Sequence, residues 1–222
     1  MITTESSFLA TAEKGKVSAI LLPPENATHL LVLGHGASTN MRHATMQAIA
    51  EALADQGIAT FRFNFPYSEN GRGRDSNDVC VETIRSAVKA ARAAAPDLQL
   101  LAGGHSFGGR MTTTAQSEKP LDDVEGLVLF SFPLHLPGRP DTKRAEHLAD
   151  INIPMLFLSG TRDELATLDL LEPTIKRLGK HAKLHLIDTA NHSYKILKRS
   201  RSSDEDVFAE MARLVSNWVK IQ

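Results

Sequence analysis

The chain has 222 residues, of which 42% are hydrophobic and 23% charged, and its formal net charge is −1. This length and composition are typical of one globular domain with a sizeable core, so we expect a single domain over residues 1–222. The small net charge gives no electrostatic drive toward nucleic acid or an anionic membrane, and no apolar run reaches the roughly 18 residues of a membrane span.

The cysteine content and the N-terminus bear on compartment and cofactors. Cys80 is the only cysteine, so an internal disulfide is impossible. Residues 1–16 lack the basic segment and apolar run of a secretory signal peptide. Neither the Cys-x-x-Cys nor the His-Glu-x-x-His spacing of zinc sites occurs. We therefore expect a cytoplasmic protein that needs no metal or organic cofactor.

The N-terminal part of the chain alternates between apolar and amphipathic segments. We predict an early strand over 16–24, which could take an antiparallel edge of a sheet, and a strand over 29–34, where Leu and Val are dense. In residues 40–57 apolar side chains recur at the spacing of one helix face, and Gly57 stands where a glycine commonly ends a helix. A further strand is expected over 58–65.

The same alternation continues to the end of the chain. After a polar loop at 66–77, strands are predicted over 98–104, 126–132, 154–160 and 183–189. Helices are predicted over 78–95, 106–117 and 167–179, the last with a break or bend near Pro173. Ser203 is the candidate N-cap of a final helix, with Asp206 at the capping-box position.

Regular alternation of strands and helices favours a doubly wound, mostly parallel sheet covered on both faces, which is an α/β fold of three layers. Right-handed crossovers place the C-terminal ends of the parallel strands at one edge, where ligands bind in such sheets. The irregular insertion at 132–150 is too short for a cap domain. We expect His135, Leu136 and His147 to roof part of an open site.

The candidate nucleophile is Ser106, in the run Gly104-His105-Ser106-Phe107-Gly108. This run fits Gly-x-Ser-x-Gly between a predicted strand and a predicted helix, where a strained turn lifts the hydroxyl clear of the sheet edge. Glycines on either side allow close approach of the neighbouring backbone. The motif also occurs by chance in glycine-rich turns, but its position after a strand favours a nucleophile.

A serine hydroxyl needs a base, and the base needs an acid to orient it. Asp163 follows the strand at 154–160, and His192 follows the next strand. Ser, then an acid, then His is one of the known chain orders of such catalytic residues. Glu164 is a possible substitute for the acid, whereas His185 lies within a strand and is expected to face a helix or solvent.

Stabilising an oxyanion requires backbone N–H donors near the nucleophile. Phe107 supplies one candidate, because its N–H lies at the start of the predicted helix. The loop after the strand at 29–34 supplies the other, and we expect the donor to be Ala37, with Gly36 letting the backbone turn toward the site. The alternative is an ordinary strand-to-helix turn.

Four stretches carry a family resemblance: HGAS, GGHSFGG, SGTRDE and ANHSY. On them the sequence resembles the α/β-hydrolase superfamily over nearly its whole length. FRFNFPY, GGHSFGGRM and FPLHLPGRP make it most similar to a small branch near dienelactone-hydrolase-like proteins, which includes the hydrolase-like domain of a histone acetyltransferase complex subunit. Typical dienelactone hydrolases use cysteine as the nucleophile, where this chain has Ser106.

Three basic features leave alternatives open. Arg110, one helical turn past the serine, could hold a substrate carboxylate, but we favour an arginine that ties its helix to a nearby acid. The sequence GRGR at 71–74 could bind an anion or be an ordinary exposed loop. The basic segment 195–201 is followed at once by acids, which favours a solvated surface over a nucleic-acid patch.

These observations together predict a serine hydrolase of the carboxylesterase type. It would cleave small acyl esters or related compounds through Ser106, Asp163 and His192, with an acyl-enzyme intermediate. Its expected partner is a small-molecule acyl substrate. We expect it to bind neither nucleic acid nor a membrane. Two alternatives remain: an interaction module that keeps the fold without catalysis, and an acyltransferase or perhydrolase that uses the same three residues.

Overall fold

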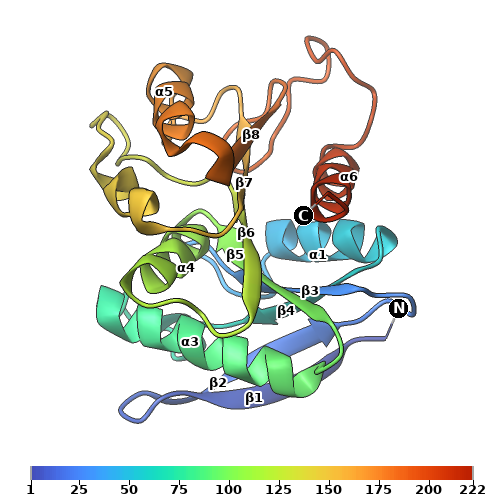
Figure 1. The fold of residues 1–222 in the computed structure, drawn as a ribbon, viewed down its shortest axis with the longest axis vertical. Coiled ribbons are helices and arrows are strands. Elements are labelled where there is room, and N and C mark those ends of the chain that lie inside the picture. Colours follow the sequence, from blue (N-terminus) through green and yellow to red (C-terminus); the bar gives the residue numbers. More distant parts are fainter. Residues whose placement is uncertain (1, 222) are drawn as a thin grey trace.

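The computed structural model describes residues 2–221, and its centre is one eight-stranded sheet (Figure 1). The strand order is β1-β2-β4-β3-β5-β6-β7-β8. β1 and β2 pair antiparallel with each other, β2 pairs antiparallel with β4, and all remaining neighbours are parallel. The strands are β1 (Thr4–Thr11), β2 (Gly15–Leu22), β3 (His29–Gly34), β4 (Ile58–Phe63), β5 (Gln99–His105), β6 (Val124–Phe130), β7 (Met155–Gly160) and β8 (Ala182–Ile187).

Helices cover both faces of this sheet, as the sequence predicts (Figure 1). α1 and α6 pack on one face, and α3, α4 and α5 pack on the other. The helices are α1 (Ala44–Asp55), α2 (Pro66–Glu69), α3 (Asn77–Ala94), α4 (Phe107–Glu118), α5 (Leu168–Leu178) and α6 (Val207–Val219), with short 3₁₀ helices η1 (Lys143–Asp150) and η2 (Gly179–His181). Within residues 2–221 we find no helix that combines the length and apolar character needed to span a bilayer.

The N-terminal segment differs from the prediction. The strand expected over 16–24 is β2, but it lies second from the edge, and the edge strand is β1, which the sequence pattern does not reveal. β1 is mostly exposed and polar over its first half, so it lacks the apolar run of a buried strand. β1 is held in the sheet by its antiparallel pairing with β2.

Three further predictions need correction. The loop expected over 66–77 begins with the one-turn helix α2, where Pro66 stands at the first helical position, which its fixed φ favours. α5 runs through Pro173 without a break, since its buried face packs on the sheet. The N-cap of α6 is Asp206 and not Ser203, because the Asp206 carboxylate accepts hydrogen bonds from the N–H groups of Phe208 and Ala209.

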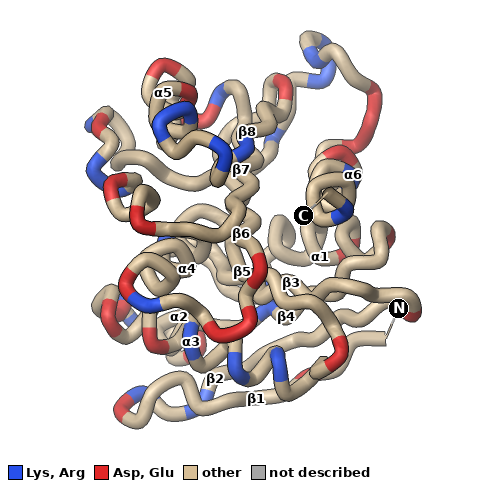
Figure 2. Tube along the Cα trace, in the orientation of Figure 1, with Lys and Arg blue, Asp and Glu red and all other residues tan. Residues whose placement is uncertain are grey.

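The loop that precedes α6 carries the two charged segments noted in the sequence. Figure 2 shows basic residues in the outer loop between β8 and α6, followed by acidic residues before the helix starts. The basic segment 195–201 thus lies in the long loop between β8 and α6. The loops after β3, β5, β7 and β8 all leave the same edge of the sheet, because these strands are parallel.

Candidate active site

Ser106 occupies the sharp turn between β5 and α4. Its φ of 52° and ψ of −113° lie in a region that non-glycine residues rarely adopt. Its N–H donates to the carbonyl of Phe130 on the neighbouring strand, at 2.8 Å, which fixes the turn to the sheet. The sequence prediction of a strained strand-turn-helix position for this residue is therefore confirmed.

Two glycines of the motif allow this turn through close approach of backbone. A Cβ on Gly104 would lie 2.7 Å from backbone atoms of Gly108 and Gly109. A Cβ on Gly108 would overlap the carbonyl group of Gly34, at the end of β3. The first turn of α4 therefore packs directly on the ends of β3 and β5, and any side chain at these positions would separate them.

His192 connects Ser106 to Asp163. Its Nε2 lies 2.8 Å from Ser106 Oγ, and its Nδ1 lies 2.9 Å from each carboxylate oxygen of Asp163. Because a carboxylate accepts, Nδ1–H donates to Asp163, which leaves Nε2 free to accept the serine proton. Asp163 is 3% exposed, whereas the neighbouring Glu164 is exposed. The structure thus brings together the three residues that the sequence selects, with Asp163 and not Glu164 in contact with His192.

The loops after β7 and β8 are bonded to each other, which holds this geometry. The N–H of Arg162 donates to the carbonyl of Ala190 at 2.9 Å. The Asn191 side-chain oxygen accepts from the N–H groups of Ser193 and Lys195, closing a tight turn around His192. Asp163 and His192 are therefore positioned by backbone contacts and do not rely on their own hydrogen bond alone.

Ser106 opens into a cavity of about 290 Å³. Ala37 and Phe107, the two expected oxyanion donors, line the same cavity. Phe107 is the first residue of α4, where backbone N–H groups lack an acceptor within the helix. A larger cavity of about 470 Å³ lies against α1, lined in part by Glu51 and Arg62, and does not include Ser106.

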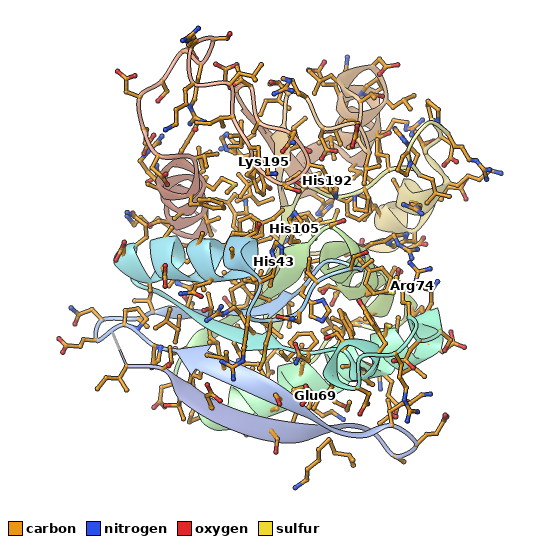
Figure 3. The ribbon with its side chains drawn as sticks, turned by 180° about the vertical axis from the view of Figure 1, so that it is seen from behind. His43, Glu69, Arg74, His105, His192 and Lys195 are labelled. Atoms are coloured by element: carbon orange, nitrogen blue, oxygen red, sulfur yellow. The ribbon has the colours of Figure 1, made fainter. Side chains whose placement is uncertain are left out.

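Two buried histidines, His35 and His105, support the site, and the sequence pattern predicts a role for neither. His105 donates from Nε2 to the carbonyl of His192 at 3.0 Å, and the centroids of the two rings lie 5.5 Å apart (Figure 3). Burial, together with the nearby His192, lowers the pKa of His105 to about 4, so this ring is neutral. The only sequence signal for it is its place directly before Ser106 in the motif.

His35 holds the loop that carries Ala37. Its Nε2 accepts from the N–H of Phe65 at 3.2 Å, so the proton resides on Nδ1, which donates to the carbonyl of Gly36 at 2.7 Å. Burial lowers the pKa of His35 to about 4, which keeps this tautomer uncharged. The side chain therefore ties the loop after β3 to the loop after β4.

The expected roof of the site is only partly present. Leu136 lines the cavity, but His135 is 1% exposed and bonds to the carbonyl of Leu136, and His147 bonds to Thr113 Oγ1 at 2.8 Å. His147 is directed toward α4 because η1 packs on that helix, and neither histidine lines the cavity. The expectation that they roof the site is wrong.

The interpretation that Arg110 ties its helix to a nearby acid is also wrong. Among residues 2–221, no carboxylate lies within 4 Å of its guanidinium. Its Cζ lies 5.6 Å from the centre of the Phe107 ring, and its side chain lines the cavity beside Ser106. It therefore does not tie its helix to an acid.

Comparison with known proteins gives a consistent result. A family model described as an alpha/beta hydrolase domain matches residues 27–220. The fold is similar to that of a dienelactone hydrolase from Anabaena variabilis, with a TM-score of 0.75 and 19% identity over 99% of this chain and 98% of that one. It is also similar to a serine hydrolase without a lid from Xanthomonas campestris, with a TM-score of 0.73 and 18% identity over 99% and 94% of the two chains.

A third similar structure contains a bound small molecule. It is the protein Est1E from Butyrivibrio proteoclasticus with ferulic acid, at a TM-score of 0.73 and 19% identity over 93% of this chain and 95% of that one. At these identities the three structures show a shared fold, with strands and helices in the arrangement described above.

Proposed function

The chain belongs to the α/β-hydrolase family, and from this premise we propose that it is a serine hydrolase that cleaves small acyl esters. The observation that carries the proposal is the unbroken series of contacts from Asp163 through His192 to Ser106, at 2.9 and 2.8 Å. A nucleophile, a base and an orienting acid in hydrogen-bond reach are what acyl transfer through serine requires.

In the proposed reaction, Ser106 Oγ attacks the acyl carbonyl while His192 Nε2 takes its proton. The carbonyl oxygen becomes an oxyanion, which accepts hydrogen bonds from the N–H groups of Ala37 and Phe107. Asp163 accepts from Nδ1 and stabilises the imidazolium that forms. The tetrahedral intermediate then collapses, and His192 gives its proton to the leaving alcohol, which leaves an acyl group on Ser106.

Water completes the cycle. His192 Nε2 takes a proton from a water molecule, which attacks the acyl-enzyme and releases the acid, and the proton returns to Ser106 Oγ. None of these steps uses a metal or an organic cofactor. A cavity of about 290 Å³ accommodates a short acyl or alcohol group, which supports small substrates over long lipids.

Fluorophosphonate labelling tests this proposal against a purely structural role for the fold. The reagent modifies serines that a neighbouring base activates, and an interaction module has no such requirement. We expect the reagent mass on the peptide that contains Ser106 in the wild-type protein, and no labelling of the Ser106→Ala variant. Labelling at another serine, or none in folded protein, would overturn the proposal.

A further inference from the structure

Three arginines from separate segments line the cavity that holds Ser106. Arg74 comes from the loop before α3, Arg110 from the first turn of α4, and Arg144 from η1. Figure 3 shows Arg74 on the side of the sheet that carries α3 and α4. The remaining wall includes Leu136, so the cavity combines a positively charged part with an apolar part.

These arginines have no carboxylate partner. Within residues 2–221, none of them has an acid within 4 Å. Asp75, next to Arg74 in the chain, pairs with Lys14 at 3.3 Å. Asp141, the acid that most favours the charge on Arg144, accepts a hydrogen bond from the N–H of Lys143. Three positive charges therefore face one cavity with no negative side chain paired to them.

The charges act on one another. Burial, and after it the positive charges of Arg144 and Arg74, together lower the pKa of Arg110 to about 10. An arginine is nevertheless charged near neutral pH. The cluster is thus electrostatically unfavourable in the free protein, and an anion placed between the guanidinium groups would relieve that repulsion.

Two of the three arginines, Arg74 and Arg110, contact the ring of Phe107, the residue after Ser106. The Cζ atoms of Arg74 and Arg110 lie 5.2 and 5.6 Å from its centroid, within the range of a cation–π contact. Arg144 is held separately, because one of its guanidinium nitrogens donates to the carbonyl of His135 at 3.0 Å. Ser106 lines the same cavity as the three arginines, so an anion bound to them shares the cavity with the candidate nucleophile.

We propose that Arg74, Arg110 and Arg144 form an anion subsite, and that the physiological acyl substrate carries a carboxylate or phosphate group that this subsite binds. The inference rests on the proposed hydrolase function and names the substrate class for the same site. Guanidinium groups suit both oxyanions, because their paired N–H donors match the spacing of two anionic oxygens. Leu136 and the neighbouring apolar wall then contact the carbon skeleton between the anion and the scissile bond.

The test compares kcat/KM for three matched pairs of substrates. Mono-4-nitrophenyl adipate against its methyl ester places a carboxylate on the acyl side. The pair 4-acetoxybenzoate and 4-acetoxybenzamide places it on the alcohol side, and 4-acetoxyphenyl phosphate against 4-acetoxyanisole tests phosphate. We expect the anionic member of at least one pair to be preferred about tenfold or more, as for charge-assisted hydrogen bonds.

For each arginine variant we compare the ratio of kcat/KM for the anionic substrate to kcat/KM for its neutral partner. A general loss of activity lowers both values and leaves this ratio unchanged. Arg110→Gln and Arg74→Gln should each lower the anionic preference about tenfold. Arg72→Gln in the same loop and Arg139→Gln in the same insertion are matched controls outside the cavity, and both should keep the wild-type ratio. If Arg110→Gln fails to fold, the exposed Arg74→Gln carries the test.

Binding of the anions alone separates this inference from the hydrolase proposal. Adipate and phenyl phosphate are titrated into wild-type protein and into Arg110→Gln, with adipamide as the neutral control. Binding that the variant loses, with no ester hydrolysed, supports the subsite and contradicts the function. Hydrolysis of neutral esters, with no anion binding and no anionic preference in any pair, overturns the subsite and leaves the function standing.

Discussion

His192 Nε2 lies 2.8 Å from Ser106 Oγ, although 86 positions separate the two residues in the chain. They follow β8 and β5, and two other strands lie between these in the sheet. The contact therefore depends on the loop after β8 reaching across the ends of β7 and β6. This loop is bonded to the loop after β7 and to His105, so its position is fixed by several independent contacts.

Replacing the candidate nucleophile should remove catalysis while keeping the fold. We expect Ser106→Ala to lower kcat for short acyl esters by a factor on the order of 10³ or more, because the groups of a triad act as a unit. The variant also removes the hydroxyl that meets His192 and leaves the backbone bond to Phe130 in place. Ester turnover by the purified variant at the wild-type rate would contradict the proposed function.

The two adjacent acids after β7 should differ sharply in their effect. Asp163→Asn keeps the shape of the side chain but removes the charge that faces His192 Nδ1, so kcat/KM should fall by about 10³. Glu164→Gln changes an exposed side chain and should leave kcat/KM within about twofold. A larger loss for Glu164→Gln than for Asp163→Asn would reverse the assignment of the acid.

The close packing of the nucleophile turn predicts an unusual sensitivity to one methyl group. Gly108→Ala would drive a Cβ into the carbonyl of Gly34, and we expect it to lower the free energy of unfolding by about 3 kcal/mol. Gly73→Ala is the matched control, because a Cβ there meets no atom within 4 Å. Urea unfolding of both variants measures the difference, and similar midpoints would contradict the packing argument.

Acid should destabilise the protein through its buried histidines. Burial lowers the pKa of His35 and of His105 to about 4 in the folded state, against about 6.5 in an unfolded chain. Between these two pH values the unfolded state binds more protons, so the free energy of unfolding falls as the pH drops from about 6.5 toward 4. The loss is on the order of a few kcal/mol for each ring.

Urea unfolding at several pH values between 4.5 and 7 measures this slope. His35→Gln removes one of the titrating rings and should flatten the dependence, even where it lowers stability at pH 7. A variant with the wild-type slope would show that the pKa of His35 does not differ between the folded and unfolded states, against the burial and the neutral tautomer described above.

The central sheet and the site could be predicted because both depend on strong local patterns. β3, β5, β6 and β7 are buried on both faces, so each is an apolar run that stands out from its surroundings. Asp163 lies in the loop after β7 and His192 in the loop after β8, which places both at the same sheet edge as Ser106. Their meeting then follows from the parallel order of the strands.

The parts that escaped prediction depend on tertiary contacts. β1 is polar in its first half, and its place is set by pairing with β2 and by the bond from Ser86 Oγ to the carbonyl of Ala10. Ser203 and Asp206 are both good N-cap residues, so the sequence alone does not decide between them. Whether Arg110 meets an acid depends on which distant segments surround it, and these turned out to carry arginines.

The β1–β2 hairpin also has a consequence for solubility during folding. It precedes the region matched by the family model, and β2 pairs with β4, whose six residues are all buried. Without the hairpin, β4 would be an apolar strand with unpaired backbone groups, which is a template for pairing with another molecule. The outer strand β1 offers a poorer template, because its first half is exposed and polar and its register shifts between Leu9 and Thr11. The hairpin therefore covers the backbone edge of β4 that could otherwise pair with another chain.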